Sequence, residues 1–400
     1  QMCIRDRLND RISVTAFAVY RNYQGGYHIM STLKTPFRYD FVGSFLRPEK
    51  LKEAKKNFEE GKITQDELDK ITDECVSEVV AKQKAAGFHA ITDGEFRRKF
   101  WHLDFMWGFD GVEHEKDGGG VQFNGEVADL EATYLVGKVK AKAHPFVEYF
   151  KFLKQFEDEN TVAKYTIPAP AQMYQQMIVP QNIEQTRKFY ASDDELIQDI
   201  GLAYQDVIRQ FYDAGCRNLQ LDDCTWGAIV GDAAKQRYKS LGLDIEDVKA
   251  QLLKVNNLAL EGRPEDMTIT SHICRGNYHS TYFTSGPYDS VADYVFAQEN
   301  VDALLLEYDD ARSGGFLPLA KVSPDKKVVL GLITTKKPEL ENKEDVIARI
   351  HDASRYIPLE RLCLSPQCGF ASCEIGNKLT EEQQWAKLAL VKEIAEEVWG

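Results

Sequence analysis

The clearest structural pattern in the chain lies in residues 193–222, which read DDELIQDIGLAYQDVIRQFYDAGCRNLQLD. Apolar side chains recur with helical spacing from Asp193 to Ala214, and a short apolar run follows from Asn218 to Asp222. A helix that leads within a few residues into a buried strand is typical of proteins in which helices alternate with parallel strands. This stretch therefore predicts the α/β class.

The same alternation extends along most of the chain in both directions. Short runs rich in β-branched and aromatic residues predict seven more strands, and amphipathic stretches of helix length lie between most of them. Eight strands separated by helices predict a (β/α)8 TIM barrel. The further strands are expected at Tyr39–Phe45, His89–Gly94, Ala163–Ala169, Met267–Cys274, Ala303–Glu307, Lys327–Ile333 and Leu362–Ser365, and the clearest further helices at Gln65–Ala86, Asp244–Leu260, Lys343–Ser354 and Thr380–Trp399.

One connection is much longer than the others. After the second predicted strand, residues from about 97 to 150 contain many aromatic side chains, the triplet Gly118-Gly119-Gly120 and alternating apolar and polar positions. This composition predicts a hairpin-bearing insertion that folds over one end of the barrel. We expect residues 30–400 to form a single catalytic barrel domain that includes the insertion.

The first 29 residues differ from the rest of the chain. Three arginines, Arg5, Arg7 and Arg11, precede a short apolar run from Ile12 to Tyr20. A signal peptide would have this order, but the run is short and no small-residue cleavage site follows it. We therefore interpret residues 1–29 as a non-native or disordered leader and place the start of the native protein at Met30.

The composition excludes several classes of partner. A net charge of −14 argues against nucleic acid and anionic lipid as partners, and no apolar run approaches the roughly 20 residues that span a membrane. The eight cysteines are spread along the chain without the spacing of a disulfide scaffold. We expect a cytoplasmic enzyme with reduced thiols and small-molecule partners, and leave open whether it is a homodimer.

Polar side chains gather where the predicted strands end. In a (β/α)8 barrel the chemistry lies at the carboxyl ends of the strands, which all face one mouth. Nearly every predicted strand here ends in a polar or metal-binding residue. These ends are Gly43-Ser44-Phe45, Asp93-Gly94-Glu95, Asp222-Asp223, His272-Ile273-Cys274, Glu307 and Cys368-Gly369.

Four of these side chains have the character of a metal site. His272 and Cys274 are two residues apart on a strand, so their side chains share a face. Together with Cys368 they offer soft or borderline donors, which select zinc, and Glu307 could supply a fourth ligand. Three strong ligands and one exchangeable ligand are typical of a catalytic zinc ion. Cys224 and Cys373 fall near the same mouth but receive no assigned role.

At these residues the sequence resembles the catalytic half of cobalamin-independent methionine synthase, and more closely its short single-barrel bacterial homologues. The resemblance extends from Phe37 to Gly400. It implies a zinc ion held by His272, Cys274, Glu307 and Cys368, and homocysteine bound by Ser44, Glu95 and Asp222. The matching stretches are Val42–Phe45, Asp93–Glu95, Leu219–Asp223, Ser271–Cys274, Leu306-Glu307 and Ser365–Gly369.

The implied reaction is transfer of a methyl group to the thiol of homocysteine, which forms methionine. A free thiol is mostly protonated at neutral pH, whereas a thiol that coordinates zinc is deprotonated and becomes the nucleophile. We expect the incoming thiol to displace Glu307, which would make Glu307 a labile catalytic ligand.

The sequence departs from this family where a folate donor would bind. Residues 169–176 lack the family's tryptophan and offer Tyr174 as their only aromatic side chain, and Lys336 lies near the place of a family histidine. Lys336 is therefore a candidate catalytic residue. Tyr174 is a candidate to stack on a donor ring, as are Trp101 and Trp107 of the insertion. The two tryptophans could instead belong to a small core with Phe105 and Phe109.

These departures predict weak use of 5-methyltetrahydrofolate, with a methylated corrinoid or a sulfonium preferred. Two other functions remain open. One is zinc-dependent alkyl transfer to a different thiol, such as the opening of an epoxide by coenzyme M. The other is a non-catalytic role with a closed zinc site. Glu95 and Asp222 favour an amino-acid thiol, because carboxylates pair with an ammonium group.

Overall fold

The computed structural model describes residues 19–21, 27–29, 33–116, 119–240 and 242–400. Most of the expected leader, residues 1–29, lies outside the described residues, as does the expected start at Met30. Of the leader, the structure describes only β1 (Val19–Arg21) and β2 (Tyr27–Ile29), which pair antiparallel.

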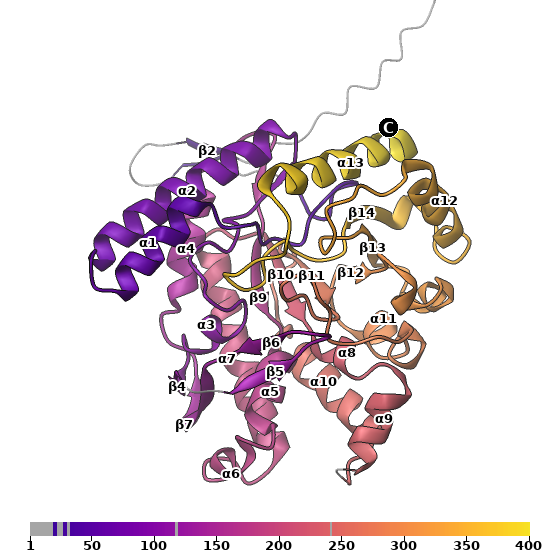
Figure 1. Cartoon of the computed structure of the whole chain (residues 1–400). Coiled ribbons are helices and arrows are strands. Elements are labelled where there is room, and N and C mark those ends of the chain that lie inside the picture. The colour runs from indigo at the N-terminus through magenta and orange to yellow at the C-terminus, as the bar shows by residue number, and fades with distance from the viewer. Residues whose placement is uncertain (1–18, 22–26, 30–32, 117–118, 241) are drawn as a thin grey trace, which may run out of the picture.

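A six-stranded parallel sheet occupies the centre of the structure, and Figure 1 shows helices around it. Its strands are buried on both faces, as expected for near-continuous apolar runs in an α/β protein. Six of the eight predicted strands are confirmed in this sheet. In spatial order they are β14 (Leu362–Pro366), β13 (Lys327–Ile333), β12 (Ala303–Glu307), β11 (Thr268–Ile273), β10 (Asn218–Asp223) and β9 (Tyr165–Pro168). The one expected at Ala163–Ala169 is shorter than predicted and corresponds to β9.

The remaining predicted strands are short. β3 (Ala90–Ile91) pairs in parallel with β8 (Val162–Ala163), and β8 is separated from β9 by a single residue. The predicted strand Tyr39–Phe45 is reduced to one parallel bridge between Tyr39 and Leu364. The ladder with β14 stops there because its next donor would be Pro366, which has no N–H. The Phe41 N–H donates to the Asp40 carboxylate (2.8 Å) and not to a strand.

The five clearest predicted helices are confirmed to within a residue or two at each end. Polar side chains fix their first turns. Thr64 and Thr380 form capping boxes, and Ser192 and Asn342 accept backbone N–H groups. These helices are α2 (Gln65–Ala85), α7 (Asp193–Asp213), α10 (Ile245–Ala259), α12 (Lys343–Ala353) and α13 (Glu381–Trp399).

Shorter helices complete the outer layer. Among the described residues, no helix is both long and apolar enough to cross a membrane. The shorter α-helices are α1 (Glu49–Glu59), α3 (Leu103–Met106), α4 (Pro145–Lys154), α5 (Pro170–Ile178), α6 (Ile183–Thr186), α8 (Thr225–Ala228), α9 (Gly231–Ser240) and α11 (Val295–Gln298), and the 3-10 turns are Tyr288–Ser290, Ala311–Ser313, Leu317–Lys321 and Leu359–Arg361.

Two antiparallel strand pairs lie between β3 and β8 in the chain. β4 (Asp110–Glu115) pairs with β7 (Ala132–Lys140), and β5 (Gly120–Gln122) pairs with β6 (Val127–Asp129). Phe105 and Phe109 are fully buried in this segment, with Phe109 stacked on a tyrosine of α7. Those two aromatic side chains therefore serve as packing groups.

The residues that connect β5 to β6 touch the loop after β11. The Asn124 N–H donates to the Tyr282 carbonyl (3.0 Å). The Glu126 carboxylate is within hydrogen-bond distance of His279 Nδ1 (3.1 Å) and forms an ion pair with Lys378 (2.7 Å). The tip of this strand pair is thus held against two segments that are distant from it in the sequence.

A buried ion pair links Asp40 to Lys164, the residue between β8 and β9. The Lys164 ammonium lies 2.7 Å from the Asp40 carboxylate, and both side chains are almost fully buried. Removing one partner of a buried pair leaves an uncompensated charge in a poorly solvated place, which costs more than the pair itself contributes.

We expect Asp40→Ala to lower the free energy of unfolding by about 3–5 kcal/mol, because Lys164 would remain buried without its counter-charge. Urea-induced unfolding followed by circular dichroism measures this change. The exposed pair Glu148–Lys151 (2.7 Å) provides the control, since Glu148→Ala should change stability by less than about 0.5 kcal/mol. Equal effects of the two substitutions would contradict the expectation.

Candidate metal centre

Four side chains with metal-binding chemistry converge at the carboxyl ends of the parallel strands. His272 lies in β11 and Cys274 directly after it, Glu307 ends β12, and Cys368 follows β14. One ligand atom from each residue lies within 4.8 Å of the corresponding atoms of the other three. The structure therefore brings together all four residues that the sequence predicted as metal ligands.

The interior of this group has the character of a site for a cation. The Cys274 and Cys368 sulfurs are 3.9 Å apart, and His272 Nε2 lies 4.0 Å from Glu307 Oε1. Both ring nitrogens of His272 and Glu307 Oε2 are buried and have no hydrogen-bond partner within the described part of the chain. Buried polar atoms without partners are rare in folded proteins, and a metal ion among the four residues would satisfy Glu307 Oε2 and one nitrogen of His272.

The two thiols are protonated when no cation lies between them. Hydrogen bonding with the Cys274 thiol, together with burial, raises the pKa of Cys368. Hydrogen bonding with the neighbouring Cys224 thiol, together with burial, raises the pKa of Cys274. A divalent cation reverses this balance, because it stabilises both sulfurs as thiolates. These four side chains are therefore better suited to hold a metal ion than to form a polar site without one.

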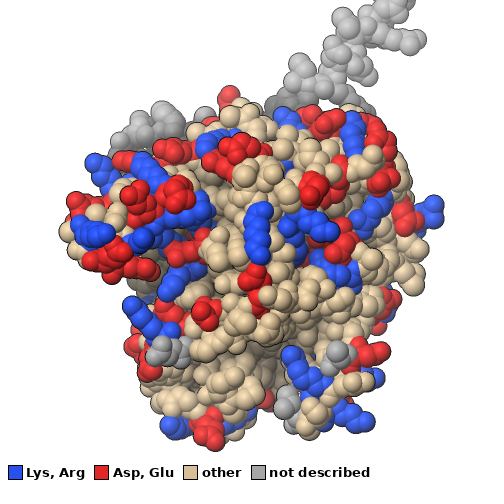
Figure 2. All heavy atoms as spheres, viewed as in Figure 1, with Lys and Arg blue, Asp and Glu red and all other residues tan. Residues whose placement is uncertain are grey.

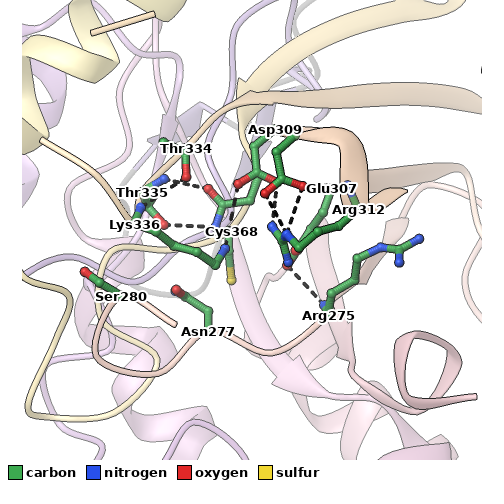
Figure 3. Close-up of polar contacts among 12 residues, drawn as sticks. Arg275, Asn277, Ser280, Glu307, Asp309, Arg312, Thr334, Thr335, Lys336 and Cys368 are labelled. Carbon is green, nitrogen blue, oxygen red and sulfur yellow. Dashed lines mark hydrogen bonds and ion pairs between the residues drawn. The ribbon is translucent and has the colours of Figure 1, made fainter. Parts of the chain in front are cut away.

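Backbone groups hold the ligands in place. The Arg275 N–H donates to Glu307 Oε1 (3.1 Å), and the Gly276 N–H donates to the Cys274 sulfur (3.3 Å). The Glu307 N–H in turn donates to the hydroxyl oxygen of Tyr288 (3.0 Å). Figure 3 shows Glu307 and Cys368 arriving from different strands, with Arg275 below Glu307. Partners of this kind orient metal ligands.

A cavity of about 280 Å³ adjoins the group. His272, Cys274 and Cys368 form part of its wall. The three residues predicted to bind an amino acid also line it, and they are Ser44, Glu95 and Asp222. The structure thus brings the predicted substrate residues to the same cavity as the predicted metal ligands.

Glu95 is held in a strained turn. Gly94 (φ 67°) and Glu95 (φ 62°) both adopt the left-handed conformation, which is uncommon for a residue with a side chain. Such strain is concentrated at functional sites. The Glu95 carboxylate accepts a hydrogen bond from the Thr166 hydroxyl (2.8 Å) and lies 3.3 Å from the Arg98 guanidinium.

Asp222 lies in the same cavity as Glu95. Its carboxylate accepts a hydrogen bond from the Gln220 amide (2.7 Å). Burial, and then the negative charge of Glu95, raise the pKa of Asp222. Two buried carboxyl groups that repel each other favour a bound cation between them.

Ser44 is coupled closely to the segment that carries Cys368. Its hydroxyl accepts the Ala371 N–H (3.3 Å), and its carbonyl accepts the Phe370 N–H (3.0 Å). A Cβ atom on Gly369 would lie 1.9 Å from the Ser44 hydroxyl oxygen, so only glycine fits there. The segment that carries Ser44 and the segment that carries Cys368 are therefore packed directly against each other.

Three residues predicted for the donor or the catalysis are not in the cavity wall. Tyr174 is fully buried and its hydroxyl donates to Gln251 of α10 (2.9 Å). Trp107 stacks on His114 at 3.8 Å, within the β4–β7 segment. Lys336 lies 3.9 Å from Asp309, as Figure 3 shows, and does not line the cavity. Trp101, in contrast, is part of the wall.

Several residues that line the cavity were not singled out from the sequence. His102 is one of them, and burial lowers its pKa to about 3, so its ring is neutral. The loop after β11 could have been found by its position, since it follows directly on His272 and Cys274. Nothing in the sequence indicated that the strand pair β5–β6 would line the cavity. The unpredicted wall residues include His102, Phe123, Gln172, Gln176, Tyr278 and Phe283.

Comparisons with known proteins agree with this arrangement. The family model described as the catalytic domain of cobalamin-independent synthase matches residues 39–397. The Bacillus subtilis protein YxjH, of uncharacterised function, is 45% identical over 92% of this chain and 96% of its own length. A methionine synthase of Saccharolobus solfataricus is 24% identical over 82% of this chain and 86% of its own length.

Two solved structures resemble this one closely. A Listeria monocytogenes protein, described as a candidate vitamin-B12-independent methionine synthase, has a TM-score of 0.73 and 37% identity, with 92% of this chain and 99% of that chain covered. A B12-independent methionine synthase from a Shewanella species, solved with selenomethionine, has a TM-score of 0.65 and 19% identity, covering 90% of this chain and 96% of its own. The fold is therefore similar to that of these catalytic domains.

We expect Cys274→Ser and Cys368→Ser each to abolish tight metal binding while the fold is retained, because each removes one of two thiolates that a soft cation requires. Elemental analysis of the purified protein, with circular dichroism, measures both. Cys363→Ser is the matched control, since Cys363 is a buried cysteine within β14 that is not among the four residues. Full metal content in either site variant would rule out the assignment.

Proposed function

The chain belongs to the family of cobalamin-independent synthase catalytic domains, and we propose that it transfers a methyl group to the thiol of homocysteine to form methionine. One observation carries this proposal. A buried group of two thiols, an imidazole and a carboxylate shares its cavity with a pair of carboxylates suited to an ammonium group. An amino acid with a thiol could bind the metal-binding group through its sulfur and the two carboxylates through its ammonium group.

We propose zinc as the metal ion. Two cysteines and a histidine are preferred zinc ligands, and catalytic zinc sites keep one position that a substrate can take. When bound, zinc supplies a Lewis acid that keeps a coordinated thiol deprotonated at neutral pH. Among the four residues, Glu307 is the ligand we expect to give way to the substrate thiol, since its carboxylate can remain on the Arg275 N–H.

The opposite end of the cavity is proposed to hold the amino-acid group. Glu95 and Asp222 would pair with the substrate ammonium, which would relieve the repulsion between the two carboxylates. The turn at Ser44 would hydrogen-bond the substrate carboxylate. This arrangement favours an amino-acid thiol over a thiol cofactor that lacks an ammonium group.

Lys336 is proposed to act through its charge. A divalent ion with two thiolates and one carboxylate carries one net negative charge, and a buried cation close to it lowers the cost of that charge. The Lys336 side chain is mostly buried, and its ammonium group has no hydrogen-bond partner in the described part of the chain, although it lies 3.9 Å from the Asp309 carboxylate. In this role Lys336 does not touch the substrate.

We further propose that the strands close into a (β/α)8 barrel and that residues 97–150 form a hairpin-bearing insertion of that single domain. The bridge at Tyr39 and the hydrogen bond from the Phe45 N–H to the Gly94 carbonyl (3.1 Å) support closure. The free cysteines support a reducing compartment, and we assign the enzyme to the cytoplasm.

We expect Glu95→Gln and Asp222→Asn each to weaken homocysteine binding by about 1.5–3 kcal/mol, or about 10- to 150-fold, because each removes one charged partner of the substrate ammonium. Isothermal titration calorimetry on the metal-loaded protein measures the affinity. The control ligand is 4-mercaptobutyrate, which keeps the thiol and carboxylate but lacks the ammonium group.

Both variants should bind 4-mercaptobutyrate about as the unsubstituted protein does. If they also bind homocysteine as tightly as the unsubstituted protein, the amino-acid group binds elsewhere and the proposal for this end of the cavity fails.

A further inference from the structure

The cavity has a second group of wall residues besides the metal ligands and the carboxylates. Aromatic and amide side chains predominate in it. They come from the region before α3, from β5–β6, from α5 and from the loop after β11. The main members are Trp101, Phe123, Gln172, Gln175, Gln176, Tyr278 and Phe283.

Three of these side chains form what we call the aromatic cluster, namely Phe123, Tyr278 and Phe283. The ring of Phe123 lies 5.3 Å from that of Tyr278 and 5.7 Å from that of Phe283, measured between centroids. The electron-rich faces of aromatic rings attract a cation placed within about 6 Å of them.

The aromatic cluster is packed directly against the metal-binding segment. Gly276, two residues after Cys274, donates its N–H to the Cys274 sulfur. A Cβ atom on Gly276 would lie 2.4 Å from Phe283 Cβ and 3.1 Å from Phe123 Cε1. The missing side chain of Gly276 therefore lets the cluster approach the place where the substrate thiol would react.

The charged residues of the described cavity wall offer no partner to an anionic donor. Glu95 and Asp222 are the acidic residues of the described wall, and this wall contains no lysine or arginine. Figure 2 shows that the charged side chains gather over α1, α2 and α13, while the face around β5 and β6 is largely uncharged. An anionic donor, such as a folate with its carboxylate tail, would find no counter-charge in this wall.

The wall also lacks a group suited to donate a proton to a leaving nitrogen. Besides the metal-ligand candidate His272, His102 is the only histidine of the described wall, and burial lowers the pKa of His102 to about 3. In the proposed function the two carboxylates are occupied by the substrate ammonium. A donor that departs as a neutral molecule needs no such proton.

The volume of the cavity restricts the size of the donor. At about 280 Å³ it lies just below the range of about 300–1,000 Å³ that is usual for one ligand. Here it must hold homocysteine and the donor together. This volume suits a small donor beside the amino acid better than a pterin with its side chain or a corrinoid ring.

We propose that the methyl donor is a small onium cation, either a sulfonium or a quaternary ammonium, held against the aromatic cluster. This inference rests on the proposed function. The homocysteine thiol first releases its proton to solvent. The thiolate sulfur then forms a bond to the methyl carbon while the bond from that carbon to the donor sulfur or nitrogen breaks. Its electron pair stays with the donor, which leaves as a neutral thioether or tertiary amine.

A panel of donors at equal concentration tests the reaction. The zinc-loaded protein is given homocysteine with S-methylmethionine, dimethylsulfoniopropionate, glycine betaine, 5-methyltetrahydrofolate or methylcobalamin, each with an isotopically labelled methyl group. We expect one of the first three to give the highest kcat/KM, and the sulfonium and ammonium arms distinguish the two sources. A higher kcat/KM with the folate or the cobalamin would overturn the inference.

Binding measurements with the onium compounds test the role of the aromatic cluster without catalytic turnover. In the absence of homocysteine, calorimetry should detect binding of at least one of the three onium compounds. Phe123→Leu and Phe283→Leu should weaken that binding about 2- to 30-fold, and Phe123→Tyr should retain it, because tyrosine keeps the aromatic face. Phe283 is 37% exposed, so its substitution leaves the core intact.

Phe58→Leu is the control, because Phe58 in α1 is equally exposed but does not line the cavity. It should bind the onium compounds like the unsubstituted protein. Absence of binding by all three compounds, or equal binding by the leucine variants of the cluster, would overturn the inference.

Cobalt substitution separates this inference from the proposed function. If homocysteine leaves the visible absorption of the cobalt-loaded protein unchanged, the thiol does not reach the metal, and both the proposed function and the inference built on it fail. If homocysteine changes that absorption but no onium compound binds, only the inference about the donor fails.

Discussion

The register of the parallel strands is the constraint on which the site depends. In that register Asp222 lies beside His272 on β10 and β11, and Glu307 lies beside Gly331 on β12 and β13. A slip of one residue would turn each of these side chains to the opposite face of the sheet. Gly331 contributes to the same constraint, since a Cβ there would lie 2.6 Å from the Gln367 Cα. That close approach brings the segment with Cys368 to the other ligands.

Burial on both faces explains why so much of this sheet could be predicted from the sequence. The strands β10 to β14 are short apolar runs flanked by polar residues, and the metal ligands could be recognised because they end those runs. The strand expected at Tyr39–Phe45 was overestimated, because Pro366 cannot continue the ladder and the Phe41 N–H bonds locally to Asp40, and neither effect appears in the apolar pattern. Apolar runs in the sequence therefore predict where strands lie better than they predict where strands end.

The donor side of the cavity was harder to predict for a different reason. Whether Tyr174 or Trp107 faces a cavity depends on the rotation of a helix and on the packing of an irregular segment, and in both cases the ring is used for packing. Phe123 and Phe283 reach the cavity from segments without regular periodicity. No pattern in the sequence relates β5–β6 to the loop after β11, because their contacts join residues more than 150 positions apart.

The aromatic part of the cavity wall and the metal-binding side chains come from different elements of the structure. The metal-binding side chains lie at strand ends whose spacing the sheet fixes, whereas Phe123 lies in a projection held at its tip by contacts among Glu126, His279 and Lys378. Substitutions in that projection can change which molecule is accepted without moving a metal ligand. Related chains can thus diverge in the molecule that this side of the cavity accepts while the four metal-binding side chains stay in place.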